Sequence, residues 1–248
     1  MTLPPHDAAP HGPLALVGSG EYLPAMLEVE RALIAGRPPR YVQIPTAAAH
    51  EGEASLRYWT ELGRAQAERL GVEAVTVVAR DRSDADDPAL AAQLEGAGLV
   101  YLSGGNPALL ADALRGTLLW AAIVAAWEGG AALAGCSAGA MAMTAWAPRL
   151  RPARHGGSDG LALVPGLRVV PHYDVMRHRV PFASWLARPP AGQVLVGIEE
   201  ETALVGGPVE WEVQGRQSVW LLAPGEKRQL RAGERVAIED GQARVLTP

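Results

Sequence analysis

Short apolar runs alternate with amphipathic segments along the chain as far as Trp146. The apolar runs have the length of buried strands, and several are followed by glycine or proline, which interrupt regular structure. They lie at Leu14–Val17, Tyr41–Ile44, Val72–Val78, Leu99–Leu102 and Ala131–Ala134. The segments between them repeat apolar residues at helical spacing, and they lie at Pro24–Ile34, Glu51–Leu70, Pro88–Leu94, Ala108–Leu114, Leu118–Trp127 and Ala138–Met143. Wholly apolar strands alternating with helices predict an α/β fold, a three-layer α/β/α sandwich around a mainly parallel sheet.

Beyond Trp146 the pattern changes to loops and short strands. We expect a loop over Arg149–Gly160 and one helix at Val175–Leu186. Strands are expected at Leu161–Val164, Leu167–Val170, Val194–Ile198, Thr202–Val205, Val209–Val213, Ser218–Leu222, Glu234–Ile238 and Ala243–Leu246. No linker separates this part from the rest, so residues 14–248 are interpreted as one catalytic domain. It carries a C-terminal β-rich extension at about residues 206–248, and residues 1–13 are interpreted as a flexible leader.

Composition and charge narrow the classes of function. The formal net charge of −5 gives no support for a nucleic-acid partner or a polybasic membrane contact. A single cysteine excludes an intramolecular disulfide and a cysteine-based zinc cluster. No His, Asp or Glu cluster has metal-ligand spacing, so neither metal nor cofactor is expected. The N-terminal residues have neither the basic nor the apolar region of a signal peptide, and a cytoplasmic location is expected.

Three loops follow predicted strands, at the edge of the sheet where functional groups of α/β folds gather. They are Gly18–Glu21, Gly104–Asn106 and the turn around Ser137. The last of these carries a G-x-S-x-G pattern at Gly135–Gly139, with a strand before it and a helix after it. That context is typical of a nucleophile elbow, which exposes a serine above the sheet. Close packing of small residues at an ordinary strand–helix turn is the alternative.

A serine nucleophile needs a base, and the base needs an orienting partner. Among six histidines, only His172 directly follows an apolar strand. Two acidic positions compete as its partner: Asp159, and one of the three consecutive glutamates Glu199–Glu201. Because apolar residues flank the glutamates, one carboxylate is expected to point inward and to be paired. For the oxyanion hole, the backbone N–H of Ala138 is one candidate, and Gly105 or Asn106 supplies the other.

Four motifs occur in the order in which one enzyme family carries them. They are Tyr101–Asn106 (YLSGGN), Gly135–Ala140 (GCSAGA), Pro171–Tyr173 (PHY) and Gly197–Leu204 (GIEEETAL). The set resembles the dipeptidase E and cyanophycinase family of serine peptidases over roughly Leu14 to Leu222. That resemblance implies a fold similar to the class I glutamine amidotransferases, which is flavodoxin-like. It also implies Ser137 as nucleophile, His172 as base and Gly105 as an oxyanion donor.

The family's branches differ in the third member of the triad. The dipeptidase branch uses an aspartate shortly after the elbow helix, whereas Ala147–Gly157 contains no acidic residue. The cyanophycinase branch uses a glutamate whose stretch maps onto Glu200. The resemblance therefore implies a triad of Ser137, His172 and Glu200, with Asp159 in reserve.

The same resemblance implies a small peptide substrate with an aspartyl residue, linked through its α- or β-carboxyl group. Arg177 and Arg179 follow His172 at about the family's spacing and are candidates to bind the aspartyl carboxylate, together with Asn106. Two alternatives remain open: a cysteine-dependent amidotransferase-like enzyme using Cys136, and a protein that binds a small ligand without catalysis. A homodimer also remains open.

Overall fold

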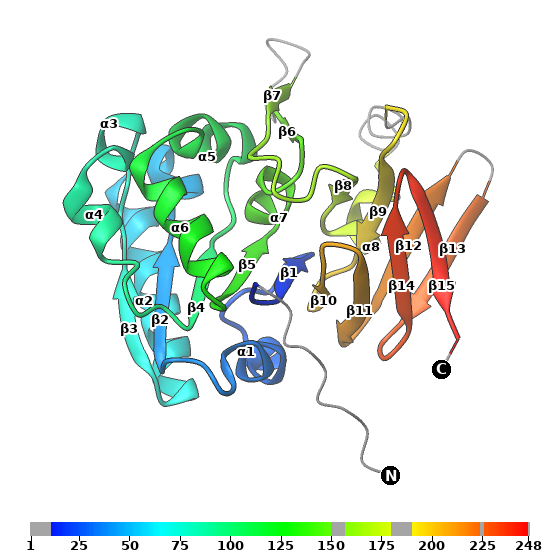
Figure 1. The fold of residues 1–248 in the computed structure, drawn as a ribbon, viewed down its shortest axis with the longest axis horizontal. Helices are drawn as coiled ribbons and strands as arrows, with labels where there is room; N and C mark the ends of the chain where they lie inside the picture. The colour runs from blue at the N-terminus through cyan, green and yellow to red at the C-terminus, as the bar shows by residue number, and fades with distance from the viewer. Residues whose placement is uncertain (1–10, 150–156, 180–189, 224–225, 248) are drawn as a thin grey trace.

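A nine-stranded mixed sheet runs through the molecule (Figure 1). The computed structural model describes residues 11–149, 157–179, 190–223 and 226–247. The strands of this sheet are, in spatial order, β3 (Glu73–Thr76), β2 (Arg40–Ile44), β4 (Leu99–Leu102), β5 (Ala132–Cys136), β1 (Leu14–Val17), β10 (Thr202–Gly206), β11 (Glu210–Gly215), β14 (Arg235–Glu239) and β15 (Gln242–Leu246). Strands β3 to β1 in this order are mutually parallel, and each later neighbour pairs antiparallel.

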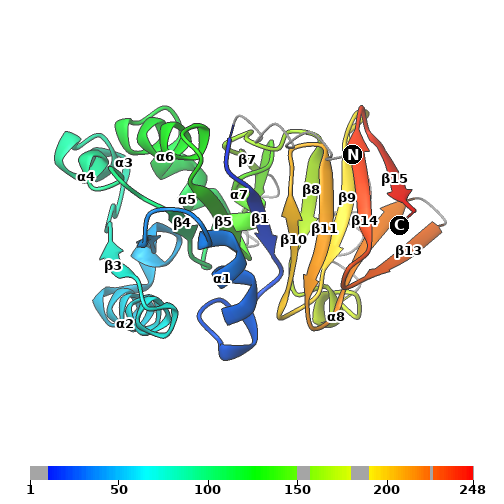
Figure 2. The ribbon, with the colours of Figure 1, turned by 60° about the horizontal axis from the view of Figure 1, so that its bottom comes forward.

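Helices cover both faces of the parallel strands, as predicted (Figure 2). One face carries α1 (Leu27–Ile34) and α2 (Glu53–Leu70). The other carries α3 (Arg82–Ala85), α4 (Pro88–Ala92), α5 (Pro107–Leu114), α6 (Leu118–Glu128) and α7 (Ala138–Ala142). Two short 3-10 helices, η1 (Pro24–Met26) and η2 (Thr46–Glu51), complete this half. The architecture is therefore the predicted α/β/α sandwich.

Strand β1 shows why the parallel strands are wholly apolar. Successive side chains of a strand point to opposite faces of the sheet. Leu14 and Leu16 pack into the core under α5 to α7, whereas Ala15 and Val17 pack into the core under α1. Both faces are shielded from water, so no polar position remains in the strand.

The C-terminal strands divide between two sheets. Strands β10, β11, β14 and β15 extend the main sheet in antiparallel pairing, beginning with Leu204 of β10 opposite Leu16 of β1. A second sheet is formed in the order β13 (Glu226–Arg231), β12 (Ser218–Ala223), β9 (Val194–Ile198) and β8 (Leu167–Val170). The predicted β-rich extension therefore packs on its own chain and lengthens the main sheet.

Strand β13 was not predicted from the hydrophobic pattern. Strand β13 is almost entirely polar, and Leu230 is its one buried residue. It lies at the edge of the second sheet, where charged side chains protect the unpaired backbone from association. An edge strand of this kind carries little of the apolar alternation on which the prediction depends.

Several expected elements after Trp146 differ from the structure. Leu161–Val164 is not a strand, because the backbone N–H groups of Leu161 and Val164 donate to the carbonyls of Ala142 and Met143 at the end of α7. The expected loop at Arg149–Gly160 contains β7 (Gly157–Asp159), which pairs antiparallel with β6 (Trp146–Pro148) just before the loop. Residues 150–156 lie outside the described part.

The expected helix after His172 and the expected leader lie partly outside the described residues. Helix α8 spans only Tyr173–Met176. Residues 180–189, which include the rest of the expected helix, lie outside the described part. Of the leader, residues 1–10 lie outside the described part. Gly12 forms two hydrogen bonds with Trp127. Its N–H donates to the Trp127 carbonyl at 2.8 Å, and its carbonyl accepts from the Trp127 indole N–H at 2.7 Å.

No single helix in the described ranges is long and apolar enough to cross a membrane. Helices α5 and α6 pass that test only as a pair, which bends by 93° between them.

Candidate active site

The nucleophile elbow is formed by β5, Ser137 and α7. Ser137 has φ of +49° and ψ of −102°, a conformation that a serine adopts only under constraint. The flanking glycines are required by close packing. A Cβ on Gly135 would lie 2.6 Å from the Gly139 carbonyl carbon, and one on Gly139 would lie 2.4 Å from the Leu102 carbonyl oxygen. The glycines of the motif therefore let β5, α7 and β4 approach closely enough to hold Ser137 in this turn.

His172 lies opposite Ser137, directly after β8. Its Nε2 is 3.0 Å from Ser137 Oγ, and its Nδ1 is 2.9 Å from Glu200 Oε1. The backbone N–H of His172 donates to the Gly18 carbonyl at 3.3 Å, which ties the second sheet to the loop after β1. Because a carboxylate only accepts hydrogen bonds, Glu200 favours the tautomer with the proton on Nδ1, and Nε2 is then free to accept from the serine hydroxyl.

Glu200 is held by its backbone as well as by the imidazole. Its N–H donates to Asp174 Oδ1 at 3.1 Å, and its carbonyl accepts from Gln217 Nε2 at 3.0 Å. Its side chain is 41 % exposed and that of His172 is 37 % exposed, so this end of the arrangement faces solvent. The backbone of Glu200 is therefore held by two neighbouring elements, α8 and the turn before β12.

The three consecutive glutamates have three different environments. Glu199 is buried and accepts from the Trp220 indole N–H at 2.9 Å and from the Ser218 N–H at 3.1 Å. Glu201 turns outward to Arg216 at 2.9 Å. The structure thus confirms that one carboxylate of the triplet points inward, but this residue is Glu199, and the partner of His172 is its neighbour.

The loop after β4 brings a glycine N–H beside the elbow. Gly105 has φ of +137°, and a Cβ there would lie 2.4 Å from the Ala47 carbonyl oxygen, so only glycine fits. Asn106 donates its N–H to the same carbonyl at 2.9 Å and caps α5 by accepting from Leu109 N–H. Asn106 N–H is therefore excluded as an oxyanion donor. Within the described residues, Gly105 and Ala138 N–H have no backbone acceptor, as expected for Ala138 at the first position of a helix.

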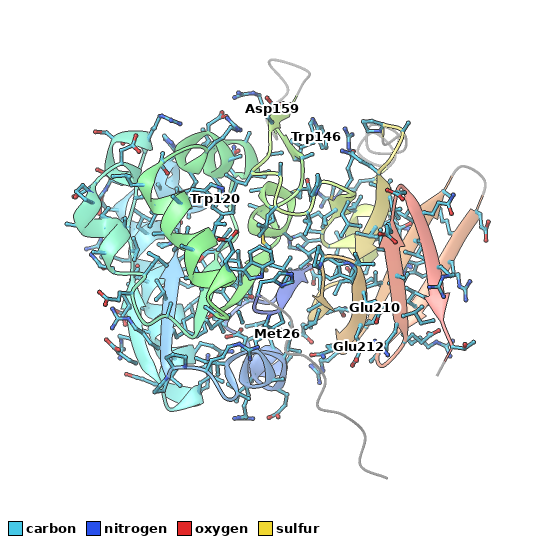
Figure 3. All side chains as sticks on the ribbon, in the orientation of Figure 1. Met26, Trp120, Trp146, Asp159, Glu210 and Glu212 are labelled. Atoms are coloured by element: carbon cyan, nitrogen blue, oxygen red, sulfur yellow. The ribbon has the colours of Figure 1, made fainter. Side chains whose placement is uncertain are left out.

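Two of the residues suggested for substrate or triad roles have other partners. Arg177 lies 3.4 Å from Glu199 Oε1 and over the Trp220 ring, 5.8 Å from its centroid. Asp159 is exposed on the β6–β7 hairpin beside Trp146, and its carbonyl accepts from Arg115 (Figure 3). The structure therefore places Glu200, and not Asp159, at His172.

Arg179 differs from Arg177. It is exposed, and its guanidinium has no hydrogen bond or ion pair to the chain that the structure describes.

Cys136 does not have the environment of a nucleophile. It is fully buried, and its thiol donates to Glu21 Oε2 at 2.7 Å. Burial raises the pKa of this thiol well above its usual range, and the neighbouring Glu21 raises it further. A buried, protonated thiol is a poor nucleophile, which argues against a cysteine-dependent reaction.

Glu21 is the residue of the site that the sequence did not assign. It is buried, and it accepts from Gly104 N–H at 2.9 Å as well as from Cys136. Its position at the carboxyl end of β1, in one of the three strand-end loops, was the one signal that could have found it.

No group of three or more His, Cys, Asp or Glu residues in the described part is arranged to hold a metal ion. A groove of about 1060 Å³ lies at the opposite, amino-terminal end of the parallel strands, and it is lined by residues such as Pro13, Pro38 and Ala131. It has no contact with the elbow.

Comparisons with known proteins identify the family of this chain. The sequence profile described as peptidase family S51 matches residues 14–207. A crystal structure of a peptidase from an acI-B1 Actinobacterium is 42 % identical, with a TM-score of 0.85 over 92 % of this chain and 97 % of that one. A candidate peptidase E from Listeria monocytogenes EGD-e shares the fold at 17 % identity, with a TM-score of 0.60 over 89 % and 100 % of the two chains. No curated protein sequence matches.

The family profile covers both the elbow and the strand that follows Glu200, and the Actinobacterium peptidase matches nearly the whole chain. The protein therefore belongs to peptidase family S51 and is a serine-type peptidase.

Proposed function

We propose that the protein hydrolyses short peptides through a triad of Ser137, His172 and Glu200. The Ser137 hydroxyl oxygen attacks the scissile carbonyl carbon while His172 Nε2 takes its proton. The oxyanion receives hydrogen bonds from the N–H groups of Gly105 and Ala138. The peptide C–N bond then breaks, and the imidazolium returns the proton to the leaving amine. Water, deprotonated by His172, hydrolyses the resulting acyl-enzyme and regenerates Ser137.

One observation supports this proposal above the others. A strained serine at a strand–helix turn lies at hydrogen-bonding distance from an imidazole, and a carboxyl group lies at the other ring nitrogen. Each of the three side chains comes from a different part of the chain. Structural stability alone does not require that convergence on a partly buried serine.

We infer an aspartyl residue in the substrate, linked through its α- or β-carboxyl group. The support is the motif resemblance, together with the exposed guanidinium of Arg179, which is not used by the described part of the chain. A guanidinium binds a carboxylate through two parallel hydrogen bonds, which gives both affinity and orientation. Arg177 has less support for this role, because Glu199 and Trp220 already hold it.

A serine-directed fluorophosphonate tests the catalytic assignment. We expect the wild-type protein to be labelled on Ser137, as located by peptide mass spectrometry, and the Ser137→Ala variant to be unlabelled and inactive. The matched control is Cys136→Ser, which keeps a hydrogen-bond donor beside Glu21 and should still be labelled. Hydrolysis that survives in Ser137→Ala but is lost in Cys136→Ser would overturn the serine assignment. An unlabelled, inactive wild-type protein would favour a ligand-binding role.

A peptide panel tests the substrate assignment. It compares α-Asp, β-Asp, Asn and Leu dipeptides that share the same second residue. We expect kcat/KM to be at least about 10-fold higher for one of the aspartyl linkages than for the Asn peptide, because only the carboxylate forms charge-assisted hydrogen bonds. Equal values for Asp and Asn would refute the aspartyl preference and leave the serine mechanism standing.

A further inference from the structure

A buried carboxyl group lies directly beneath the two loops that form the catalytic centre. Glu21 follows β1 and is 8 % exposed. Its Oε1 accepts from Gly104 N–H at 2.9 Å, and its Oε2 accepts from the Cys136 thiol at 2.7 Å. Gly104 precedes Gly105 in the chain, and Cys136 precedes Ser137. One carboxyl group therefore joins the residue before the oxyanion donor to the residue before the nucleophile.

The packing around Gly104 leaves no room for another arrangement. A Cβ on Gly104 would lie 2.6 Å from Glu21 Oε1 and 3.7 Å from Ser137 Cβ. The carboxyl oxygen thus occupies the space directly beneath this peptide. The neighbouring residue joins the loop after β1 to the loop after β4 a second time, because the Tyr22 hydroxyl and Ser103 Oγ are 2.6 Å apart in the buried interior.

We propose that Glu21 is a positioning residue that sets the oxyanion hole against the nucleophile. The inference rests on the proposed serine mechanism. By accepting from Gly104 N–H, the carboxyl group fixes the orientation of the Gly104–Gly105 peptide and so the direction of Gly105 N–H. By accepting from Cys136, it holds the end of β5 at a set distance from that peptide. Oxyanion stabilisation depends on donors that are already in place before the reaction, so an error in this distance acts on the transition state.

The thiol of Cys136 acquires a role in this arrangement. Burial and the neighbouring Glu21 raise its pKa, so it stays protonated and can donate. The cysteine of the elbow thus acts as a hydrogen-bond donor to Glu21 and not as a nucleophile.

The test compares three variants with the wild-type protein. Glu21→Ala removes both acceptors, and Glu21→Gln keeps an oxygen for Gly104 N–H. Glu30→Gln is the matched control, because Glu30 is also a buried glutamate on the α1 side of the sheet but has no hydrogen bond to Gly104 or Cys136. For each variant we would measure kcat, KM, the rate of fluorophosphonate labelling of Ser137, and the thermal unfolding midpoint.

We expect Glu21→Ala to lower both kcat and the labelling rate about 100-fold, as the loss of one oxyanion donor does, with KM changed less than about threefold. Glu21→Gln should recover most of the loss, to within about 10-fold of wild type. Glu30→Gln should have wild-type kcat and labelling rate. If Glu21 had a purely structural role, Glu21→Ala would lower the thermal unfolding midpoint without a large fall in kcat at nearly constant KM.

Other outcomes overturn the inference. Glu21→Ala with kcat within about twofold of wild type would refute it, as would an equal loss in Glu30→Gln. If Glu21→Ala does not fold, two variants of Cys136 test the inference instead. Cys136→Ala should lower kcat several-fold, whereas Cys136→Ser should keep kcat near wild type. Wild-type kcat in both variants would refute the inference. Wild-type protein that is not labelled on Ser137 would overturn the serine mechanism and this inference together. A labelled wild type with an equally labelled Glu21→Ala would overturn only the inference.

Discussion

The two halves of the molecule contribute to the site in different ways. The parallel half comprises the strands β1 to β5 with their helices. It supplies Ser137 and the proposed oxyanion donors, and Cys136 and Ala138 on either side of the serine are completely buried. The antiparallel half comprises β8 to β15, whose described strand pairs are antiparallel except for β8 with β9. It supplies His172 and Glu200, whose side chains are 37 % and 41 % exposed. The proposed nucleophile thus lies between two completely buried residues, whereas its proposed base and acid lie closer to solvent. Function depends on how accurately the two halves are joined.

Strand β1 and its loop form that junction. Strand β1 pairs parallel with β5 on one side and antiparallel with β10 on the other. Gly18 N–H donates to the Thr202 carbonyl at 2.9 Å, and the Gly18 carbonyl accepts from His172 N–H. A Cβ on Gly18 would lie 2.1 Å from the Glu199 carbonyl oxygen. The two halves are therefore joined by backbone hydrogen bonds, at a point where any side chain would separate them.

The largest expected effect comes from removing the base that the antiparallel half provides. His172→Ala should lower kcat by about 10⁴-fold or more, and Ser137→Ala should lower it by a similar factor. Because the two residues act as a unit, the double variant should be no worse than either single variant. Steady-state kinetics of all three proteins would test this, and a double-variant loss equal to the product of the single losses would contradict it.

Glu200→Gln should have the next largest effect. An amide at this position can no longer hold His172 in the required tautomer, and we expect kcat to fall by about 10³-fold. Asp159→Asn is the matched control on the β6–β7 hairpin and should keep kcat within about twofold of wild type. A larger loss of kcat in Asp159→Asn than in Glu200→Gln would assign Asp159, and not Glu200, as the acidic partner of His172.

Gly18→Ala tests the junction itself. The added methyl group must push the Glu199 carbonyl away, so we expect the free energy of unfolding to fall by about 1–3 kcal/mol. Because His172 and Glu200 move with that segment, kcat should fall about 100-fold, as for a misplacement of about 1 Å. Gly166→Ala is a suitable control, because its added Cβ would meet no atom within 4 Å and, as at Gly18, its φ is not in the positive region that favours glycine. Normal kcat in Gly18→Ala would show that the junction tolerates this displacement.

Arg179→Ala tests whether the antiparallel half also selects the substrate. We expect KM for the preferred aspartyl peptide to rise about 10-fold, because a charge-assisted hydrogen bond is lost. Arg177→Ala should act differently and mainly lower stability, since Arg177 is paired with the buried Glu199. KM values for Asp and Asn peptides would be compared, and an equal change for both would refute a role in carboxylate recognition.

The smallest effect on activity is expected at Glu30, inside the parallel half. Burial is the main cause that raises the pKa of Glu30 from 4.5 to about 7, and the nearby Tyr41 and Gln66 offset this only in part. Between these values the folded protein keeps a proton that the unfolded chain releases, so rising pH favours unfolding. The wild type should therefore lose about 2–3 kcal/mol of stability relative to Glu30→Gln between pH 5 and pH 8.

Urea unfolding of both proteins at the two pH values would measure this difference, and kcat should be equal in both. A stability difference that does not change with pH would contradict the raised pKa of Glu30.

Much of the parallel half could be predicted because its signals are local. The strands at Leu14–Val17 and Leu99–Leu102 have the predicted bounds, and so do Leu167–Val170 and Val194–Ile198 in the second sheet. Leu14–Val17 and Leu99–Leu102 are uninterrupted apolar runs, and the other two are interrupted only by Arg168 and Gly197. Gly18 and Pro171 mark the ends of two of them. Strand β13 and the β6–β7 hairpin were missed because their residues are polar or lie on edges, where burial leaves no periodic pattern.

The elbow could be predicted from the sequence alone, because Gly135, Ser137 and Gly139 are close in the chain and their turn depends on local backbone geometry. It also determined which histidine ends a strand, and it identified Glu200 by resemblance. Three contacts became visible only in the folded structure. Glu200, and not Asp159, meets His172, and Glu199 is the inward carboxylate. Glu21 lies between Gly104 and Cys136. An apolar pattern reports that a segment is buried but not which segment it faces. Those contacts depend on strand pairing between residues distant in the chain, above all the two-sided pairing of β1.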